Sequence, residues 1–359
     1  MDFSKAFDTV PHQRLLGKLR LYGIDKNIHK WISHFLVGRT QSVVVDGVRS
    51  KEDHVGSGVP QGTVLGPLLF LLHINDIANT LDPTTKCRLF ADDCLLYRTI
   101  KNPQDQAALQ TDLTRLEHWA SDWGMRFNAA KCYIMSISRS NRIDHMYQLC
   151  DTILQGVSQE RYLGVNIANN LQWQNHIQKV HITANQKLGF LKRNLKSCPK
   201  ELRYTAYTTI VRTGLDYAAT IWDPHQKGHK NQLEMVQRKA ARWICNDYGR
   251  HSSVTQMLRK LNLEPLEERR RAARLVLMYK ILNREIAVPP EDLGLQRNPR
   301  ATRGNYTQDK LIVPRTQTNE LKHHFVARTI PDWNRLPESV TSVGNSKLFK
   351  KQLTGYPRP

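Results

Sequence analysis

The sequence predicts an α+β fold, with a mixed domain of strands and helices first and a basic, mostly helical region after it. Two observations predict this division. Short strand-like runs alternate with helix-like stretches up to about residue 165, whereas the later segments carry one apolar stripe at helical spacing. The charge changes at the same place: residues 1–164 hold 19 Lys and Arg against 17 Asp and Glu, and residues 165–359 hold 34 against 15.

The first predicted elements are two helices. Leu15, Leu16 and Leu19 form a helical stripe that Gly23 can end. Asp25 can cap a second helix, which we expect to end at Gly38. The residues expected to be buried on this second helix are Ile28, Trp31, Ile32 and Phe35.

Hairpins and a loop followed by a helix come next. TQSVVVDG is typical of a strand, and Asp46–Gly47 predicts a hairpin with the following VRSKEDHV. The glycine-bearing loop SGVPQG precedes a helix that begins at about Val64. KCRLF and CLLYRTI predict a second hairpin, which carries the acids of FADD at its tip.

Asn102–Pro103 opens a further predicted helix, which Gly124 ends. Its inward residues are expected to be Leu109, Leu113, Leu116, Trp119 and Trp123. Short strands at MRFN, CYIMSIS and RYLGVNI complete the first region. The later helices are expected to show Lys and Arg outward, and the polar stretch from about Pro289 to Val313 predicts a loop or linker.

Composition excludes several classes of protein. The longest apolar run, Leu65–Ile74, contains a proline and is too short to span a bilayer. No basic and apolar leader of the secretory kind begins the chain, so we expect an intracellular protein that is not secreted. The six cysteines show no CxxC spacing, which indicates buried thiols rather than disulfides or a zinc site.

Three aspartates could carry chemistry. Asp92 and Asp93 are adjacent at a predicted hairpin tip, where a bound divalent cation would remove their repulsion, although a solvated turn explains an isolated pair equally simply. Asp2, on a strand beside this hairpin, would add a third carboxylate. Such a set suits two metal ions and in-line phosphoryl transfer. For Asp8 we prefer the role of a helix N-cap.

The loop SGVPQGTVLGPLLF could approach a ligand closely because of Gly58, Pro60 and Gly62. Gln61 offers a neutral amide that can hydrogen-bond a nucleotide or a template base without reading its identity. An ordinary loop before a core helix is an equally good interpretation of this segment alone.

Five segments in order, DFSKAFDTVPH, GVPQGTVLGPLLF, FADD, GMRFNAAKC and YLGV, resemble the palm motifs of reverse transcriptases. The resemblance is closest to the LINE-type, non-LTR retrotransposons of the jockey-like group. It implies a right-hand palm with an antiparallel sheet over residues 1–165, lacking most of the fingers. A helical thumb over residues 166–288 and a loop-rich basic tail over residues 289–359 would follow.

The resemblance implies an RNA-directed DNA polymerase that uses two Mg²⁺ ions, with Mn²⁺ as a substitute. Its partners would be an RNA template, a DNA primer and deoxynucleoside triphosphates. Asp2, Asp92 and Asp93 would bind the metals. Lys131 would donate a proton to the leaving pyrophosphate, unless it is a plain surface lysine.

Further roles follow from the same resemblance. The residues beside the incoming nucleotide and template would be Phe3, Phe7, Pro60, Gln61 and Gly62. Phe7 stands at the position of the steric gate against a ribose 2′-hydroxyl, a role compatible with core packing. Tyr162, Leu163 and Gly164 resemble the primer grip, with a plain turn at a sheet edge as the alternative.

The chain departs from the family at its beginning. Only Met1 precedes the strand that carries Asp2, where the family has a long fingers region that binds the triphosphate. We therefore expect a 5′-truncated element or a gene model begun at an internal methionine. Such a chain would polymerise poorly alone, and fingers and endonuclease would have to come from elsewhere.

The basic half is predicted to bind phosphates without sequence preference. The candidate residues are Arg238, Lys239, Arg242, Arg269, Arg270 and Arg271. The tryptophans of this half, Trp173, Trp222, Trp243 and Trp333, are more often core residues than stacking platforms. Two alternatives stay open: a nucleic-acid-binding remnant of the same fold without turnover, and a two-metal nuclease.

Overall fold

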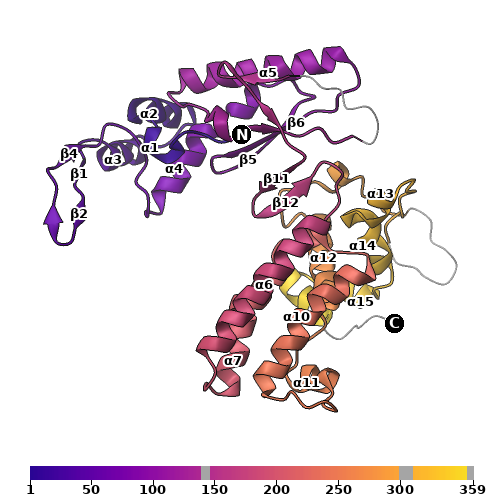
Figure 1. Cartoon of the computed structure of the whole chain (residues 1–359). Coiled ribbons are helices and arrows are strands. Elements are labelled where there is room, and N and C mark those ends of the chain that lie inside the picture. The colour runs from indigo at the N-terminus through magenta and orange to yellow at the C-terminus, as the bar shows by residue number, and fades with distance from the viewer. Residues whose placement is uncertain (139–145, 299–309, 354–359) are drawn as a thin grey trace. The chain divides into compact units, whose positions relative to one another are not determined.

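The computed structural model describes residues 1–138, 146–298 and 310–353 (Figure 1). The chain divides into two compact units, Met1–Ser158 (unit 1) and Gln159–Pro359 (unit 2). Strands and helices alternate in unit 1, whereas unit 2 is helical after one hairpin, so the mixed helix and sheet content is confirmed. In the described residues the strands form six two-stranded sheets and not one continuous antiparallel sheet.

Unit 1 contains five α-helices and five strand pairs in its described part. The helices are α1 (Ala6–Thr9), α2 (His12–Leu21), α3 (Lys26–Leu36), α4 (Leu65–Ile74) and α5 (Pro103–Asp122). The strands are β1 (Thr40–Gln41), β2 (Val44–Val45), β3 (Val48–Arg49), β4 (Asp53–His54), β5 (Lys86–Phe90), β6 (Asp93–Tyr97), β7 (Tyr133–Ile134), β8 (Gln148–Leu149), β9 (Thr152–Ile153) and β10 (Gln155–Gly156).

The predicted helix signals of unit 1 are largely confirmed. The leucine stripe of α2 is buried, and Gly23 follows it with φ +73°. The Asp25 carboxylate accepts hydrogen bonds from the main-chain N–H groups of Asn27 and Ile28, as an N-cap does. Asn102 caps α5 in the same way, and the predicted inward residues of α5 lie in the core or pack against it.

The predicted buried face of α3 is partly wrong. Ile32 is buried, but Ile28 is 53% exposed and Trp31 is 57% exposed. Trp31 instead stacks on Phe35, with ring centroids 6.0 Å apart. On α3, the apolar stripe therefore does not coincide with the face that the rest of the chain buries.

One lysine is buried in the core of unit 1. Lys18 of α2 is 1% exposed, pairs with Asp76 at 2.5 Å and lies 3.7 Å from the ring centroid of Trp123. Burial lowers the pKa of Lys18, and the hydrogen bond to Asp76 opposes that shift. This contact joins α2 to the segment after α4.

Unit 2 begins with the hairpin β11 (Gln159–Tyr162) and β12 (Val165–Ala168). Its helices are α6 (Gln174–Asn194), α7 (Lys200–Ala206), α8 (Arg212–Asp216), α9 (Ala219–Trp222), α10 (Lys227–Cys245), α11 (Val254–Lys260), α12 (Leu266–Leu282), α13 (Asn319–His323), α14 (Phe325–Asn334), α15 (Glu338–Thr341) and α16 (Ser346–Leu353). A π-helical turn, Tyr207–Val211, joins α7 to α8.

Two apolar clusters form the core of unit 2. Trp222, Trp243 and Trp333 are all buried within them, and Trp173 packs partly buried against the first, so the expectation of core tryptophans is confirmed. Part of the predicted loop after Pro289 lies outside the described residues, at positions 299–309. In the described part of the chain, no helix has both the length and the apolar character needed to cross a membrane.

Candidate active site

The first four residues of the chain lie between strand β6 and the segment from Arg126 to Asn128. Met1 and Cys94 of β6 exchange two main-chain hydrogen bonds, Met1 N to Cys94 O at 2.7 Å and Cys94 N to Met1 O at 3.1 Å. On the other side Phe3 forms an antiparallel bridge with Phe127, and Asn128 N donates to Asp2 O at 2.9 Å. The main chain thus brings Asp2 beside the hairpin that carries the other two acids.

The acidic hairpin has the geometry expected from the sequence. In the β5–β6 pair Phe90 lies opposite Asp93, which leaves Ala91 and Asp92 as a two-residue turn. Ala91 has φ +50°, a left-handed conformation that costs a non-glycine residue about 1 kcal/mol. The tight turn is therefore mildly strained at the residue before the two carboxylates.

The three aspartates interact electrostatically. Burial raises the pKa of Asp93, and the charges of Asp92 and Asp2 raise it further. Lys131 Nζ lies 3.8 Å from Asp2 Oδ2, with 68% of the lysine side chain exposed. The structure therefore brings together all four residues predicted to be catalytic.

As placed, these side chains do not enclose an ion. Within the described ranges no three His, Cys, Asp or Glu residues are grouped so that they could hold a metal. The donors are nevertheless of the type that Mg²⁺ prefers, because all three are carboxylates.

The residues before Pro60 pack against α1 and the residue that follows it. Gly58 N donates to Val10 O and Val59 N donates to Phe7 O, both at 2.8 Å. A Cβ on Gly58 would lie 2.8 Å from Asp8 O, so this approach requires glycine, which has φ +89° here. Pro60, Gln61 and Gly62 follow directly.

Gln61 has a partner that the sequence did not suggest. Its Nε2 donates to Asp8 Oδ1 at 2.8 Å. The preferred role of Asp8 as a helix N-cap is wrong, because Asp8 lies inside α1 and the residue before α2 is Pro11. Asp8 instead holds the amide of the predicted nucleotide-binding loop, a contact between residues 53 positions apart that no local pattern indicates.

The two predicted aromatic contacts differ in exposure. Phe7 is partly buried and stacks on Phe70 of α4, with centroids 4.4 Å apart. Phe3 is 3% exposed and stacks on Phe127. The Phe3 side chain is therefore a core residue, and its prediction as a nucleotide contact is corrected: of the two predicted aromatic contacts, only Phe7 is not fully buried.

The predicted primer-grip segment forms a two-residue turn between β11 and β12, in unit 2. Tyr162 pairs with Val165, and Leu163 and Gly164 have φ values of +45° and +80°. Tyr217 Oη donates to Leu163 O at 2.9 Å, and a Cβ on Gly164 would lie 3.1 Å from the Tyr217 ring. Tyr217 thus supports this turn, although nothing in the sequence singled it out.

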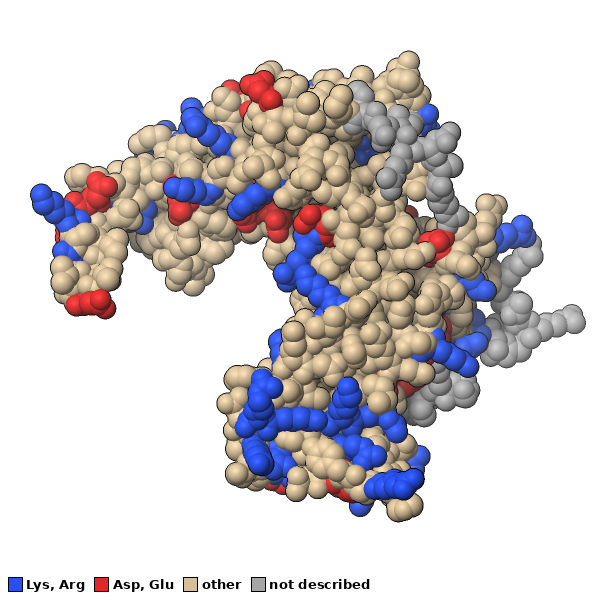
Figure 2. Space-filling model, in the orientation of Figure 1, with Lys and Arg blue, Asp and Glu red and all other residues tan. Residues whose placement is uncertain are grey.

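Lysines and arginines gather on the helices of unit 2, most visibly over the end where α7 and α11 lie (Figure 2). On α10, Lys239 is exposed, and Arg238 and Arg242 are partly buried. Burial lowers the pKa of Lys192 on α6, and the nearby charge of Lys239 lowers it further. The α6–α10 pair therefore presents a face with closely spaced cations.

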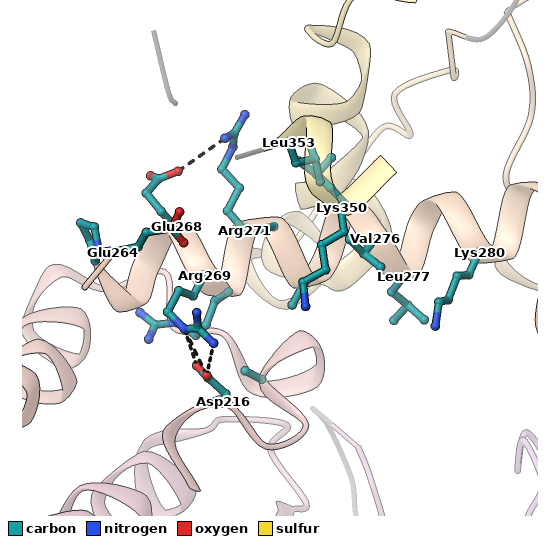
Figure 3. Close-up of a pocket in the computed structure, with 16 residues that line it drawn as sticks. Asp216, Glu264, Glu268, Arg269, Arg271, Val276, Leu277, Lys280, Lys350 and Leu353 are labelled. Atoms are coloured by element: carbon teal, nitrogen blue, oxygen red, sulfur yellow. Dashed lines mark hydrogen bonds and ion pairs between the residues drawn. The ribbon is translucent and has the colours of Figure 1, made fainter. Parts of the chain in front are cut away.

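The predicted arginine run on α12 faces mostly inward. Arg269 is clamped by Asp216, with Nη2 2.5 Å from Oδ2, beside a cavity of 510 Å³ (Figure 3). The prediction that Arg270 and Arg271 contact nucleic acid is wrong, because they are only 1% and 6% exposed. Arg270 pairs with Asp223 at 2.8 Å, and Arg271 pairs with Glu268 at 3.4 Å.

Comparisons with known proteins find similarity to reverse transcriptases. Residues 1–167 match the family described as reverse transcriptase, RNA-dependent DNA polymerase. The chain is 29% identical over 254 residues to the RNA-directed DNA polymerase from mobile element jockey of Drosophila funebris, covering 68% of this chain and 28% of that protein.

Two relatives from Drosophila melanogaster are similar at comparable levels. The probable RNA-directed DNA polymerase from transposon BS is 28% identical over 290 residues, which cover 75% of this chain and 31% of that protein. The corresponding protein from transposon X-element is 25% identical over 268 residues, 72% of this chain and 29% of that protein. This chain thus spans less than a third of the length of these relatives.

Proposed function

We propose that this chain, whose residues 1–167 form a reverse transcriptase domain, is part of an RNA-directed DNA polymerase of a non-LTR retrotransposon. The reaction is template-directed nucleotidyl transfer, in which a primer 3′-hydroxyl attacks the α-phosphorus of a deoxynucleoside triphosphate and pyrophosphate leaves. One observation carries the proposal: main-chain hydrogen bonds between Met1 and Cys94, 93 positions apart in the sequence, hold Asp2 beside the hairpin that carries Asp92 and Asp93.

Asp2, Asp92 and Asp93 would hold two Mg²⁺ ions, or Mn²⁺ in their place. When bound, the ions neutralise charge on the attacking and leaving oxygens. The support from the structure is the donor chemistry, since Asp93 is repelled by both Asp2 and Asp92 and a shared cation would remove that repulsion. The contribution of the chain is to fix these carboxylates through main-chain pairing of Met1 with Cys94 and through the tight turn at Ala91.

The other residues position substrate. Lys131, beside Asp2, would give a proton to the leaving pyrophosphate. Phe7, which stacks on Phe70, would exclude ribonucleotides because its ring would clash with a ribose 2′-hydroxyl. Gln61, oriented by Asp8, would contact the nucleotide or template, with Pro60 and Gly62 shaping the loop.

Unit 2 would handle the nucleic acid. The Tyr162–Gly164 turn would position the primer end, and its support is the Tyr217 hydrogen bond that rigidifies it. The α6–α10 face, with Arg238, Lys239 and Arg242, would bind the template–primer backbone through charge. These roles would give the helical unit the function of a thumb.

Metal binding tests the site without requiring turnover. We expect Mn²⁺, followed by electron paramagnetic resonance, to bind the wild-type chain, and Asp92→Asn to weaken that binding at least tenfold. Asp122→Asn is the matched control, because Asp122 is an exposed aspartate at the end of α5. Equal Mn²⁺ binding by Asp92→Asn and the wild type would refute the metal site.

Primer extension on an RNA template tests the reaction. We expect Asp92→Asn to lower the rate by about 1,000-fold, because several kcal/mol of transition-state stabilisation depend on the metals. We also expect the wild-type chain itself to extend slowly, and robust extension would refute that part. Binding of nucleic acid without any extension would favour the alternative of a non-catalytic remnant.

A further inference from the structure

A hollow of 550 Å³ lies between α2 and α3 in unit 1. Its polar lining residues are Gln13, Arg20, Lys26, His29, Lys30 and Ser33. The lining contains three cations, no carboxylate, and no Phe, Tyr or Trp. None of these residues belongs to the proposed catalytic set.

The three cations are unneutralised. Arg20, Lys26 and Lys30 are all exposed, and none forms an ion pair with another described residue. Asp25 is close in sequence but does not line the hollow, and its Oδ1 accepts from two main-chain N–H groups at the start of α3. The positive charge of the hollow is therefore available to an external anion.

This concentration of charge does not follow from the composition of the unit. Residues 1–164 are nearly balanced, with 19 Lys and Arg against 17 Asp and Glu. Some other cations of unit 1 are paired with acids: Lys18 with Asp76, Arg98 with Asp82 and Arg115 with Asp112.

The walls of the hollow are held in place. The His29 ring Nε2 lies 2.9 Å from Leu16 O and donates to it, which ties α3 to α2. Lys26 and Lys30 are one helical turn apart on α3, and Arg20 faces them from α2. Cations fixed on two rigid helices can follow successive phosphates of a strand, with Gln13 and Ser33 as neutral hydrogen-bonding groups.

We propose that this hollow binds the phosphate backbone of a nucleic-acid strand. Backbone contacts fit because the lining supplies cations and neutral hydrogen-bonding groups but no aromatic face on which a base could stack. The proposal rests on the proposed function only in the choice of single-stranded RNA as the probe. Binding is measured without divalent metal or nucleotide, so failure of the polymerase reaction would leave this result unaffected.

The test uses the full chain and a fluorescent single-stranded oligoribonucleotide, with anisotropy measured at several salt concentrations. The test variant carries Arg20→Gln, Lys26→Gln and Lys30→Gln. Three lost phosphate contacts should reduce the slope of log affinity against log salt by about 2, at about 0.7 per contact. We expect the affinity to fall at least tenfold at low salt.

The matched control removes the same charge elsewhere on unit 1, with Arg49→Gln, Lys51→Gln and Lys101→Gln, all exposed and outside the hollow. It should leave the slope within about 0.7 of wild type. Equal slopes for the test variant and the wild type would overturn the proposal, and so would equal losses in test variant and control. Thermal unfolding of both variants checks that neither has lost its fold.

A second arm separates backbone binding from binding of a free polyphosphate. Inorganic tripolyphosphate is titrated calorimetrically into the wild type and the test variant. If the test variant lost tripolyphosphate binding while it kept the wild-type RNA slope, the hollow would be a small-molecule site and the proposal would fail. Crosslinking of 4-thiouridine RNA to the peptide spanning residues 13–33 is the supporting result.

Discussion

The two units use their cations in opposite ways. Residues 1–164 have almost no net charge, yet Arg20, Lys26 and Lys30 of unit 1 stand unpaired around a hollow. Residues 165–359 hold 34 Lys and Arg against 15 Asp and Glu, yet the densest arginine run of unit 2, on α12, is turned into the core. Net charge therefore says which unit attracts a polyanion, whereas burial decides which residues can touch it.

The inward arginines of unit 2 are ion-paired with two aspartates. Asp223 contacts Arg270 at 2.8 Å, Arg274 at 3.0 Å and Arg328 at 3.1 Å, and it is itself 8% exposed. Asp332 contacts Arg274 at 3.2 Å. This network joins α12 and α14 to the end of α9, so its arginines serve the fold of unit 2 and not its surface.

The largest expected effect comes from removing the shared partner. Asp223→Asn should lower the free energy of unfolding of unit 2 by about 4 kcal/mol, because breaking a buried ion pair leaves uncompensated charge. Asp216→Asn is the matched control, since its partner Arg269 is 31% exposed and the expected loss is below about 1 kcal/mol. Hydrogen exchange of α12 and α14 peptides measures both. If Asp223→Asn cost no more than Asp216→Asn, the α12 arginines would not be structural.

This contrast explains what the sequence could predict. Local signals held: the α2 stripe, the Asp25 cap and the FADD hairpin are each decided within a few residues. The burial of Arg270 was missed because its partner Asp223 lies 47 positions away in the sequence. The sequence of an arginine run beside glutamates does not indicate whether the arginines face water or a buried aspartate.

In the candidate site, too, local features could be predicted from the sequence, whereas tertiary contacts could not. Asp92 and Asp93 were predictable as a pair because a tight turn is local, and Asp2 was placed by the resemblance to palm motifs. The bond from Gln61 to Asp8 and the support of the Leu163 carbonyl by Tyr217 depend on tertiary contacts. Neither could be read from spacing or composition.

Acid should destabilise both units, because each contains a buried histidine whose pKa is strongly lowered. Burial lowers the pKa of His73 in unit 1 and of His176 in unit 2 to about 4, from 6.5. The unfolded chain therefore binds more protons between these values, and stability falls as pH decreases from about 6.5 to about 4.

Each histidine should remove at most about 3 kcal/mol over this range. Hydrogen exchange of α4 and α6 peptides at pH 7 and at pH 4.5 measures the two losses separately. His73→Gln should flatten the pH dependence of unit 1 and leave that of unit 2 unchanged. His176→Gln should reduce the pH dependence of unit 2, where other histidines also have lowered pKa, and leave that of unit 1 unchanged. If stability still fell steeply with decreasing pH in both variants, groups other than His73 and His176 would cause the loss.

The smallest expected effect is the difference in stability loss between two glycine-to-alanine substitutions, one in each unit. Gly62 and Gly164 both have positive φ values, +76° and +80°, so alanine at either position should cost about 1 kcal/mol in the left-handed conformation. A Cβ on Gly62 meets nothing within 4 Å, whereas on Gly164 it would lie 3.1 Å from the Tyr217 ring.

Gly164→Ala should therefore be the more destabilising change, by roughly 0.5–1 kcal/mol for displacing a packed side chain. The pair Gly164→Ala and Tyr217→Phe separates strain from hydrogen bonding, because the phenylalanine keeps the ring but not the bond to Leu163 O. Urea unfolding of the three variants measures the differences. Equal costs for Gly62→Ala and Gly164→Ala would mean that the ring yields freely, and Tyr217 would then lose its role as the support of this turn.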